Sequence, residues 1–281
     1  MSSSKGHLER VLFAYHLFRT AAKTRDGLLL EEGDFNARVA ELDNRTVAEI
    51  ESQIEYLESH RVGVLSAEST LYPSALTRRG KAVVPALFYR GDIATMDGPL
   101  VAVSGSRNVS DRGAAAASRL GEVVAQTGYG LISGKARGVD SLASTSALQS
   151  GGVVVLVLPE GIASVDWKEF ANSDSGRILV LSQFTPSQRW TVHGAMERNR
   201  VICGLANTVV VVEAGETGGS LAAGREALKI GRQLLAFTYR EDTPPGNRIL
   251  LREGARAVSS PDELREILSS SGDEAREPHL F

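Results

Sequence analysis

Residues 101–140 decide the fold, and they read VAVSGSRNVSDRGAAAASRLGEVVAQTGYGLISGKARGVD. Two short apolar segments, 100–104 and 131–133, are each followed at once by a turn that carries glycine, serine and cationic residues. An alanine-rich segment with helical character begins at Asp111 and lies between them. The pattern predicts two parallel strands joined by a helix, whose glycine turns meet at the carboxyl edge of one sheet. Turns of this kind are typical of anion-binding sites in α/β proteins.

The alternation of strand and helix continues after residue 150. Four near-continuous apolar runs suit strands that are covered on both faces, as in a parallel sheet. They lie at residues 153–158, 178–181, 209–212 and 234–237. Segments with helical character lie at residues 138–149, 165–171, 195–205, 220–230 and 261–269. We therefore predict an α/β fold, Rossmann-like and doubly wound, with a mainly parallel sheet and a small N-terminal helical domain.

The N-terminal part has a different pattern. Amphipathic helices are predicted at residues 7–22 and 46–60, and the second has the capping-box spacing of Thr46 and Glu49. The polar segment 31–43 has room for one more short helix. Residues 87–89 then read as an edge strand among proline and glycine turns. The predicted domains are a helical domain at 1–70, a linker and edge strand at 71–98, a Rossmann-like domain at 99–269 and a flexible tail at 270–281.

Composition excludes several classes of protein. The formal net charge is -3, so any nucleic-acid binding must come from a local basic patch. The single Cys203 rules out an internal disulfide and a cysteine metal cluster. We find no signal peptide and no apolar run long enough to span a bilayer, and therefore expect a cytoplasmic protein with no membrane partner.

The two standard nucleotide motifs are missing. After Gly105 no further glycine follows until Gly113, which excludes G-x-G-x-x-G. Gly134-Lys135 is followed by Ala136, and Tyr129 stands where a P-loop needs its first glycine. No nucleophile-elbow motif, paired-carboxylate spacing or histidine ligand motif is present. The sequence predicts no catalytic residue, no cofactor and no metal.

Four segments carry candidate phosphate-binding residues. Ser106 offers a hydrogen-bond donor and Arg107 a bidentate guanidinium, although a solvated turn is the alternative reading. Lys135 and Arg137 add cations beside a helix start, where Asp140 suits the helix dipole. The full set is Gly105, Ser106, Arg107, Ser133, Gly134, Lys135, Arg137, Arg198, Asn199, Arg200, Gly218, Gly219 and Ser220.

The cations at the start of the helix predicted at 195–205 need an anionic partner, because positive charge is disfavoured at a helix N-terminus. That partner is either a carboxylate such as Glu213 or a bound phosphate. Glu213 itself has three open roles: it bonds a sugar hydroxyl, pairs with an arginine, or simply ends its strand. The glycines that follow it open a helix whose N–H groups suit a phosphate.

Taken in order, these motifs resemble the DNA-processing protein A family, also called DprA or Smf, over residues 72–255. The motifs are Tyr72-Pro73, Pro85 to Asp92, Gly105-Ser106-Arg107, Ser133 to Asp140, Ala147-Leu148, Gly151-Gly152, Arg198 to Leu205, Val212-Glu213-Ala214, Gly219-Ser220-Leu221, Gly231-Arg232, Gly246-Asn247 and Gly254-Ala255. Departures include Lys135 in place of the usual leucine and Gln183 in place of the usual glutamate. A C-terminal winged-helix domain is not expected.

The resemblance implies a non-catalytic, dimeric protein that binds single-stranded DNA, protects incoming strands and loads a RecA-type recombinase during natural transformation. It also implies that the DNA pocket uses Gly105, Ser106 and Arg107, together with the cations at 135, 137, 198 and 200. Two other hypotheses stay open. One is a sensor of a nucleotide-derived ligand, for example in genome defence. The other is a phosphoribohydrolase, whose P-G-G-x-G-T signature residues 215–220 match only in part.

Overall fold

A computed structural model describes residues 4–170 and 176–274. The chain divides into two units, and each is built from several segments. The first unit takes residues 1–91, 158–172 and 180–195, and the second takes residues 92–157, 173–179 and 196–281. The predicted helical domain lies within the first unit, whereas the stretch 99–269 contributes to both. The domain boundaries drawn from sequence stay a prediction.

Four helices open the first unit: α1 (Ser4–Phe18), α2 (Ala21–Leu28), α3 (Glu32–Ala40) and α4 (Asn44–Ser59). The single helix predicted at 7–22 is therefore two helices. Arg19, with a φ of 53°, breaks the chain direction, and the Thr20 side chain caps α2. The predicted capping box at Thr46 is also wrong. Asp43 caps α4 instead, because its Oδ1 accepts a hydrogen bond of 2.9 Å from the Thr46 N–H.

The strands of the first unit correct the predicted edge strand. β4 (Ala86–Arg90) pairs antiparallel on one side with β1 (Gly63–Ser66) and on the other with residues 180–182 of β8 (Ile178–Ser182). It is thus an internal strand, which agrees with the complete burial of Phe88. The remaining short elements are η1 (Ser74–Leu76), β2 (Thr77–Arg78), β3 (Lys81–Ala82), η3 (Ile162–Ser164) and η4 (Trp167–Phe170). η4 lies within the helix predicted at 165–171, whose final residue is outside the described part of the chain.

The second unit contains a parallel sheet in the strand order β7-β6-β5-β9-β10-β11. Its strands are β5 (Leu100–Ser104), β6 (Gly130–Ser133), β7 (Val154–Val157), β9 (Thr208–Val211), β10 (Gln233–Phe237) and β11 (Arg256–Val258). The chain runs outward from β5 to β7 and later outward again from β9 to β11. The order therefore reverses between β5 and β9, and the prediction of a doubly wound, mainly parallel sheet is confirmed.

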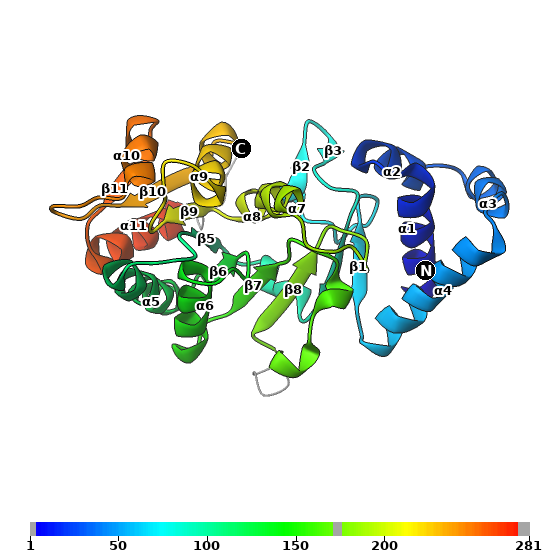
Figure 1. The fold of residues 1–281 in the computed structure, drawn as a ribbon, viewed down its shortest axis with the longest axis horizontal. Coiled ribbons are helices and arrows are strands. Elements are labelled where there is room, and N and C mark those ends of the chain that lie inside the picture. Colours follow the sequence, from blue (N-terminus) through cyan, green and yellow to red (C-terminus); the bar gives the residue numbers. More distant parts are fainter. Residues whose placement is uncertain (1–3, 171–175, 275–281) are drawn as a thin grey trace. The chain divides into compact units, whose positions relative to one another are not determined.

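Helices cover both faces of this sheet (Figure 1). One layer contains α5 (Asp111–Gln126), α6 (Val139–Gln149) and α11 (Pro261–Glu274), and the other contains α8 (Asn199–Leu205), α9 (Gly219–Lys229) and α10 (Pro245–Arg252). A short 3-10 turn, η2 (Ile93–Met96), precedes β5. α5 and α6 pack closely because Gly121 has no side chain. A Cβ at this position would overlap the backbone of Ala143. No helix in the described ranges is long and apolar enough to cross a membrane.

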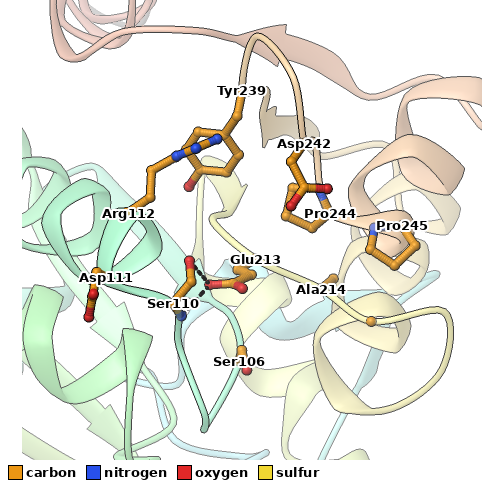
Figure 2. A pocket seen from close by; sticks show the side chains of 11 residues that line it. Ser106, Ser110, Asp111, Arg112, Glu213, Ala214, Tyr239, Asp242, Pro244 and Pro245 are labelled. Carbon is orange, nitrogen blue, oxygen red and sulfur yellow. Dashed lines mark hydrogen bonds between the residues drawn. The ribbon is translucent and has the colours of Figure 1, made fainter.

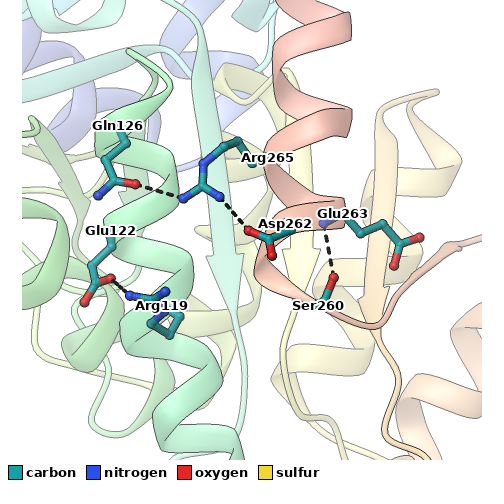
Figure 3. A network of polar contacts seen from close by, with 7 residues as sticks. All are labelled: Arg119, Glu122, Gln126, Ser260, Asp262, Glu263 and Arg265. Atoms are coloured by element: carbon teal, nitrogen blue, oxygen red, sulfur yellow. Dashed lines mark hydrogen bonds and ion pairs between the residues drawn. The ribbon is translucent and has the colours of Figure 1, made fainter.

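Polar contacts join α11 to α5 at the surface (Figure 3). Arg265 donates to Gln126 of α5 at 2.9 Å and to Asp262 of its own helix at 2.8 Å. Arg119 pairs with Glu122 along α5. α11 continues to residue 274, five residues beyond the predicted helix end, so the start of the predicted flexible tail is helical. Residues 275–281 of that tail lie outside the described residues.

Candidate functional site

The turns that follow β5 and β6 contact each other. The Val139 N–H donates to the Ser106 carbonyl at 3.2 Å, and the Arg137 guanidinium donates to Asn108 Oδ1 at 2.8 Å. Gly138 has a φ of 82°, and a Cβ there would overlap the Ser106 carbonyl. A Cβ on Gly105 would meet Val139 at 2.5 Å. The glycines are therefore required by close packing of the two turns, and the predicted meeting at one sheet edge is confirmed.

A buried arginine and a buried aspartate brace the β6 turn. Asp140, in the first turn of α6, accepts hydrogen bonds from the backbone N–H groups of Gly134 at 2.9 Å and Ala136 at 3.4 Å. The Arg198 guanidinium lies against Gly134 so closely that a Cβ there would overlap it. Arg198 is only 6% exposed and interacts electrostatically with Asp140. Of the two partners left open by the sequence, a carboxylate or a bound phosphate, the structure supplies a carboxylate, and it belongs to Asp140 rather than to Glu213.

The electrostatics of this pair reflect its burial. Burial raises the pKa of Asp140, and the charge of Arg198 and the two backbone N–H groups oppose that rise. Burial lowers the pKa of Arg198, which the charge of Asp140 raises and the charge of Arg107 lowers. Arg198 Nε is buried without a hydrogen-bond partner in the described chain. Arg107 and Arg198 thus lie within electrostatic range of each other, and both act on the buried Asp140.

The remaining predicted segments join the same edge through α8. The helix predicted at 195–205 is divided at Arg198 into α7 (Val192–Glu197) and α8. Asn199 Nδ2 donates to the Gly219 carbonyl at 3.4 Å, which links the start of α8 to the start of α9. Gly218, with a φ of 106°, and Gly219 are exposed and face open space.

The predicted phosphate-binding residues differ in how exposed their side chains are at this edge. Four cations have exposed side chains: Arg107, Lys135, Arg137 and Arg200. Ser220 is half-buried. Ser133 is fully buried, and its hydroxyl bonds to Ser144 Oγ at 3.0 Å, so its side chain is turned into the unit rather than presented at the edge.

A pocket of about 520 Å³ adjoins this edge at the point where the strand order reverses (Figure 2). It lies beyond the carboxyl ends of β5, β9 and β10, which is the usual ligand position in doubly wound sheets. Its lining consists of Ser106, Ser110, Asp111, Arg112, Glu213, Ala214, Gly215, Tyr239, Asp242, Pro244 and Pro245. The sequence singled out Ser106 and Glu213 as candidate ligand-binding residues, and Ala214 and Gly215 only as members of motifs. Tyr239, Asp242 and Pro244 lie in the loop between β10 and α10 and belong to no motif, so only the sheet topology brings them to the pocket.

Two sets of hydrogen bonds fix the pocket wall, one exposed and one buried. Glu213 Oε2 accepts hydrogen bonds from the Ser110 N–H at 3.0 Å and the Ser110 hydroxyl at 3.3 Å, at the start of α5. Asn247 is fully buried, accepts from the Ala214 N–H at 2.9 Å and donates to the Phe237 carbonyl at 2.9 Å. The ends of β9 and β10 are therefore held together by one amide side chain.

Tyr239 stands above the pocket, with the Arg112 guanidinium 5.3 Å from its ring centroid. Burial raises the pKa of Tyr239 to about 12, the charge of Glu213 adds to the rise, and that of Arg112 opposes it. Its hydroxyl is buried and has no hydrogen-bond partner among the described residues. A buried hydroxyl without a partner is uncommon in native proteins.

Comparison with known proteins identifies the family. The family model described as DNA recombination-mediator protein A matches residues 63–269. The chain belongs to this family. It is 33% identical over 226 residues to Protein Smf of Escherichia coli strain K12, a match that spans 78% of this chain and 60% of the relative. It is 31% identical over 186 residues to DNA processing protein DprA of Streptococcus pneumoniae, which spans 63% of this chain and 64% of the relative. The matches thus span less than two thirds of these relatives' length.

Solved structures of DNA processing protein A share the fold. The Streptococcus pneumoniae structure matches with a TM-score of 0.69 and 26% identity, over 93% of both chains. A Helicobacter pylori structure matches with a TM-score of 0.63 and 22% identity, over 75% of this chain and 97% of that one. The resemblance expected from the glycine turns is confirmed at the level of family and fold.

Proposed function

We propose that this chain binds single-stranded DNA through the phosphate backbone at the edge formed by the β5 and β6 turns. The observation that carries the proposal is the pair Arg107 and Arg198, two guanidinium groups that lie within electrostatic range of each other and of the buried Asp140. Phosphate oxygens of a bound strand would relieve the repulsion between the two guanidinium groups. Exposed Lys135, Arg137 and Arg200 extend the positive surface beside them.

The chemistry of this edge suits positioning rather than cleavage. Guanidinium groups on rigid glycine turns give phosphate a bidentate partner, and phosphate contacts fix a strand without reading its sequence. The overall net charge of -3 gives no general attraction for DNA, so affinity must come from this local cluster. The DNA processing protein A of Helicobacter pylori is described for its single-stranded DNA binding mode, which supports the same ligand here.

Fluorescence anisotropy with a labelled 20-nucleotide oligo-dT at low salt tests the proposal. We expect Arg107→Ala to weaken binding by roughly tenfold, because one charge-assisted hydrogen bond contributes about 1.5 to 3 kcal/mol. The fold should be unchanged, since the Arg107 side chain is exposed. Arg119→Ala is the matched control, because Arg119 is an exposed arginine of the same unit that pairs with Glu122. Equal affinities for wild type and Arg107→Ala would refute the proposal.

We further propose that the chain binds DNA without cleaving it, as the family membership suggests. Binding would protect the strand and deliver it to a RecA-type recombinase, and the protein would act as a dimer. A labelled oligonucleotide incubated with the protein should keep its length and should resist an added single-strand nuclease. Recombinase filament formation on strands coated with a single-strand binding protein should become faster when the chain is present. Shortening of the oligonucleotide by the purified chain would show an enzyme instead.

A further inference from the structure

We propose that the pocket of Figure 2 binds a free ribonucleotide through its sugar hydroxyls, as a ligand separate from the DNA strand. The pocket lies at the reversal of strand order, between the ends of β5 and β9, whereas the proposed phosphate contacts follow β5 and β6. Only Ser106 belongs to both regions. The inference therefore goes beyond the proposed DNA binding and stands independently of it.

The charge of the pocket excludes a phosphate backbone from its interior. Three carboxylates line it, from Asp111, Glu213 and Asp242, against one guanidinium, from Arg112. Figure 2 shows the Glu213 carboxylate below the Tyr239 ring, beside Ser110, and the Asp242 carboxylate beside Pro244. Carboxylates accept hydrogen bonds and repel phosphate, so the ligand must present donors at this end.

Glu213 and Tyr239 can both form hydrogen bonds with hydroxyl groups of a ligand in this pocket. Ser110 donates both of its hydrogen bonds to Glu213 Oε2, which leaves Oε1 as an acceptor for a ligand. The Tyr239 hydroxyl is buried and has no protein partner in the described chain. Two vicinal hydroxyls satisfy both groups at once, because each hydroxyl can donate and accept.

A ribonucleotide fits these requirements better than a nucleotide within a DNA strand. Deoxyribose inside a strand has its 3′ and 5′ oxygens esterified and lacks the 2′-hydroxyl, so it has no sugar donor for Glu213. A free ribonucleotide has vicinal 2′- and 3′-hydroxyls. Pro244, Pro245 and the Tyr239 ring give apolar surface for the base, and a volume of about 520 Å³ is in the usual range for such ligands. Its phosphate would point to Ser106, the neighbour of Arg107.

Isothermal titration calorimetry with the full chain tests the inference. The probes are AMP, GMP, CMP and UMP and their 2′-deoxy counterparts. We expect at least one ribonucleotide to bind and its 2′-deoxy counterpart to bind at least about tenfold more weakly, because the deoxy sugar leaves a charged acceptor unpaired. Absence of binding by all four ribonucleotides at millimolar concentration would overturn the inference, and so would equal binding of the deoxy counterparts.

Two variants separate a ligand role from a structural one. Tyr239→Phe should weaken nucleotide binding by about tenfold while the Tm stays equal or rises, because the change removes a buried hydroxyl that has no partner. Glu213→Gln should weaken binding similarly, since its amide keeps an oxygen acceptor for Ser110 but loses the charge. Both variants should keep wild-type affinity for oligo-dT. Unchanged nucleotide affinity in both variants would contradict the inference, whatever the result for DNA.

Discussion

Two regions of opposite charge share the carboxyl edge of the parallel sheet. The phosphate edge, defined by Arg107, Lys135, Arg137 and Arg198, follows β5 and β6. The switch-point pocket, lined by the carboxylates of Asp111, Glu213 and Asp242, follows β9 and β10. Both are built from strand-end turns. The phosphate edge is braced by two buried charged side chains, Asp140 and Arg198, and the pocket by a buried neutral amide, so the chemistry of a turn depends on the group beneath it.

The largest expected effect comes from breaking the charged brace. Arg198→Gln leaves Asp140 buried without its cation, and we expect a loss of about 3 to 5 kcal/mol in the free energy of unfolding. Urea denaturation at pH 8 measures it. Arg200→Gln, at an exposed neighbour, is the control and should change stability by less than about 0.5 kcal/mol. Equal stability of the two variants would mean that the pair does not brace the turn.

The stability loss caused by Arg198→Gln is predicted to depend on pH. Burial raises the pKa of Asp140 in the folded protein, and removal of Arg198 raises it further. The folded state then binds a proton more tightly than the unfolded state, so stability rises as the pH falls through the folded pKa. The loss caused by Arg198→Gln should therefore be smaller at pH 5 than at pH 8. A loss that grows toward low pH would contradict this assignment.

Removing the neutral brace should have a smaller effect. Asn247→Ala leaves the Ala214 N–H and the Phe237 carbonyl without partners in a buried position, and we expect a loss of roughly 2 to 3 kcal/mol. Asn207→Ala is the matched control, because Asn207 is exposed and its side chain accepts one bond, from the Leu100 N–H. Urea denaturation should give a clearly lower free energy of unfolding for Asn247→Ala than for this control. The reverse order would show that the amide does not hold the strand ends.

The smallest effect concerns the backbone of Lys135. Its φ of 54° is unfavourable for a residue with a Cβ, so Lys135→Gly should stabilise the fold by up to about 1 kcal/mol while it weakens DNA binding. Arg61 has the same φ of 54° in the first unit, and Arg61→Gly should give a similar stability gain with unchanged DNA affinity. Thermal unfolding and anisotropy together check the pair. Equal DNA affinity in both variants would show that Lys135 does not contribute to DNA binding.

Local pattern predicted the strands well because apolar runs and glycine turns mark them. β5 matches its predicted residues, β6 and β10 differ from theirs by one residue at one end, and β7 and β9 differ by one residue at each end. The break at Arg198 escaped prediction, since its cause is burial against Gly134, which is distant in sequence. α10 was missed because it opens with Pro245-Gly246, which is typical of a turn, and β11 was missed because two of its three residues are exposed. β4 was misread as an edge strand because its partner β1 is only four residues long.

In the candidate site, too, some residues were predicted from the sequence and others were not. Sequence reasoning found the cations and glycines of the phosphate edge, because they stand directly after predicted strands. It left the partner of Arg198 open between a carboxylate such as Glu213 and a phosphate, and it did not find Asp140, because that contact depends on which turns touch. It missed Tyr239 and Asp242, which follow the last long strand without a motif. Pairing across strand ends is a property of topology, and residue spacing alone does not encode it.

The salt dependence of DNA binding tests the central claim most directly. Each phosphate neutralised on a single strand contributes about 0.7 to the slope of log affinity against log salt concentration. Anisotropy titrations of oligo-dT across a range of NaCl concentrations give that slope for wild type and for Arg107→Ala. We predict a negative slope for wild type that becomes shallower by about 0.7 in the variant. Equal slopes, or binding by wild type that does not depend on salt, would contradict a phosphate contact at Arg107.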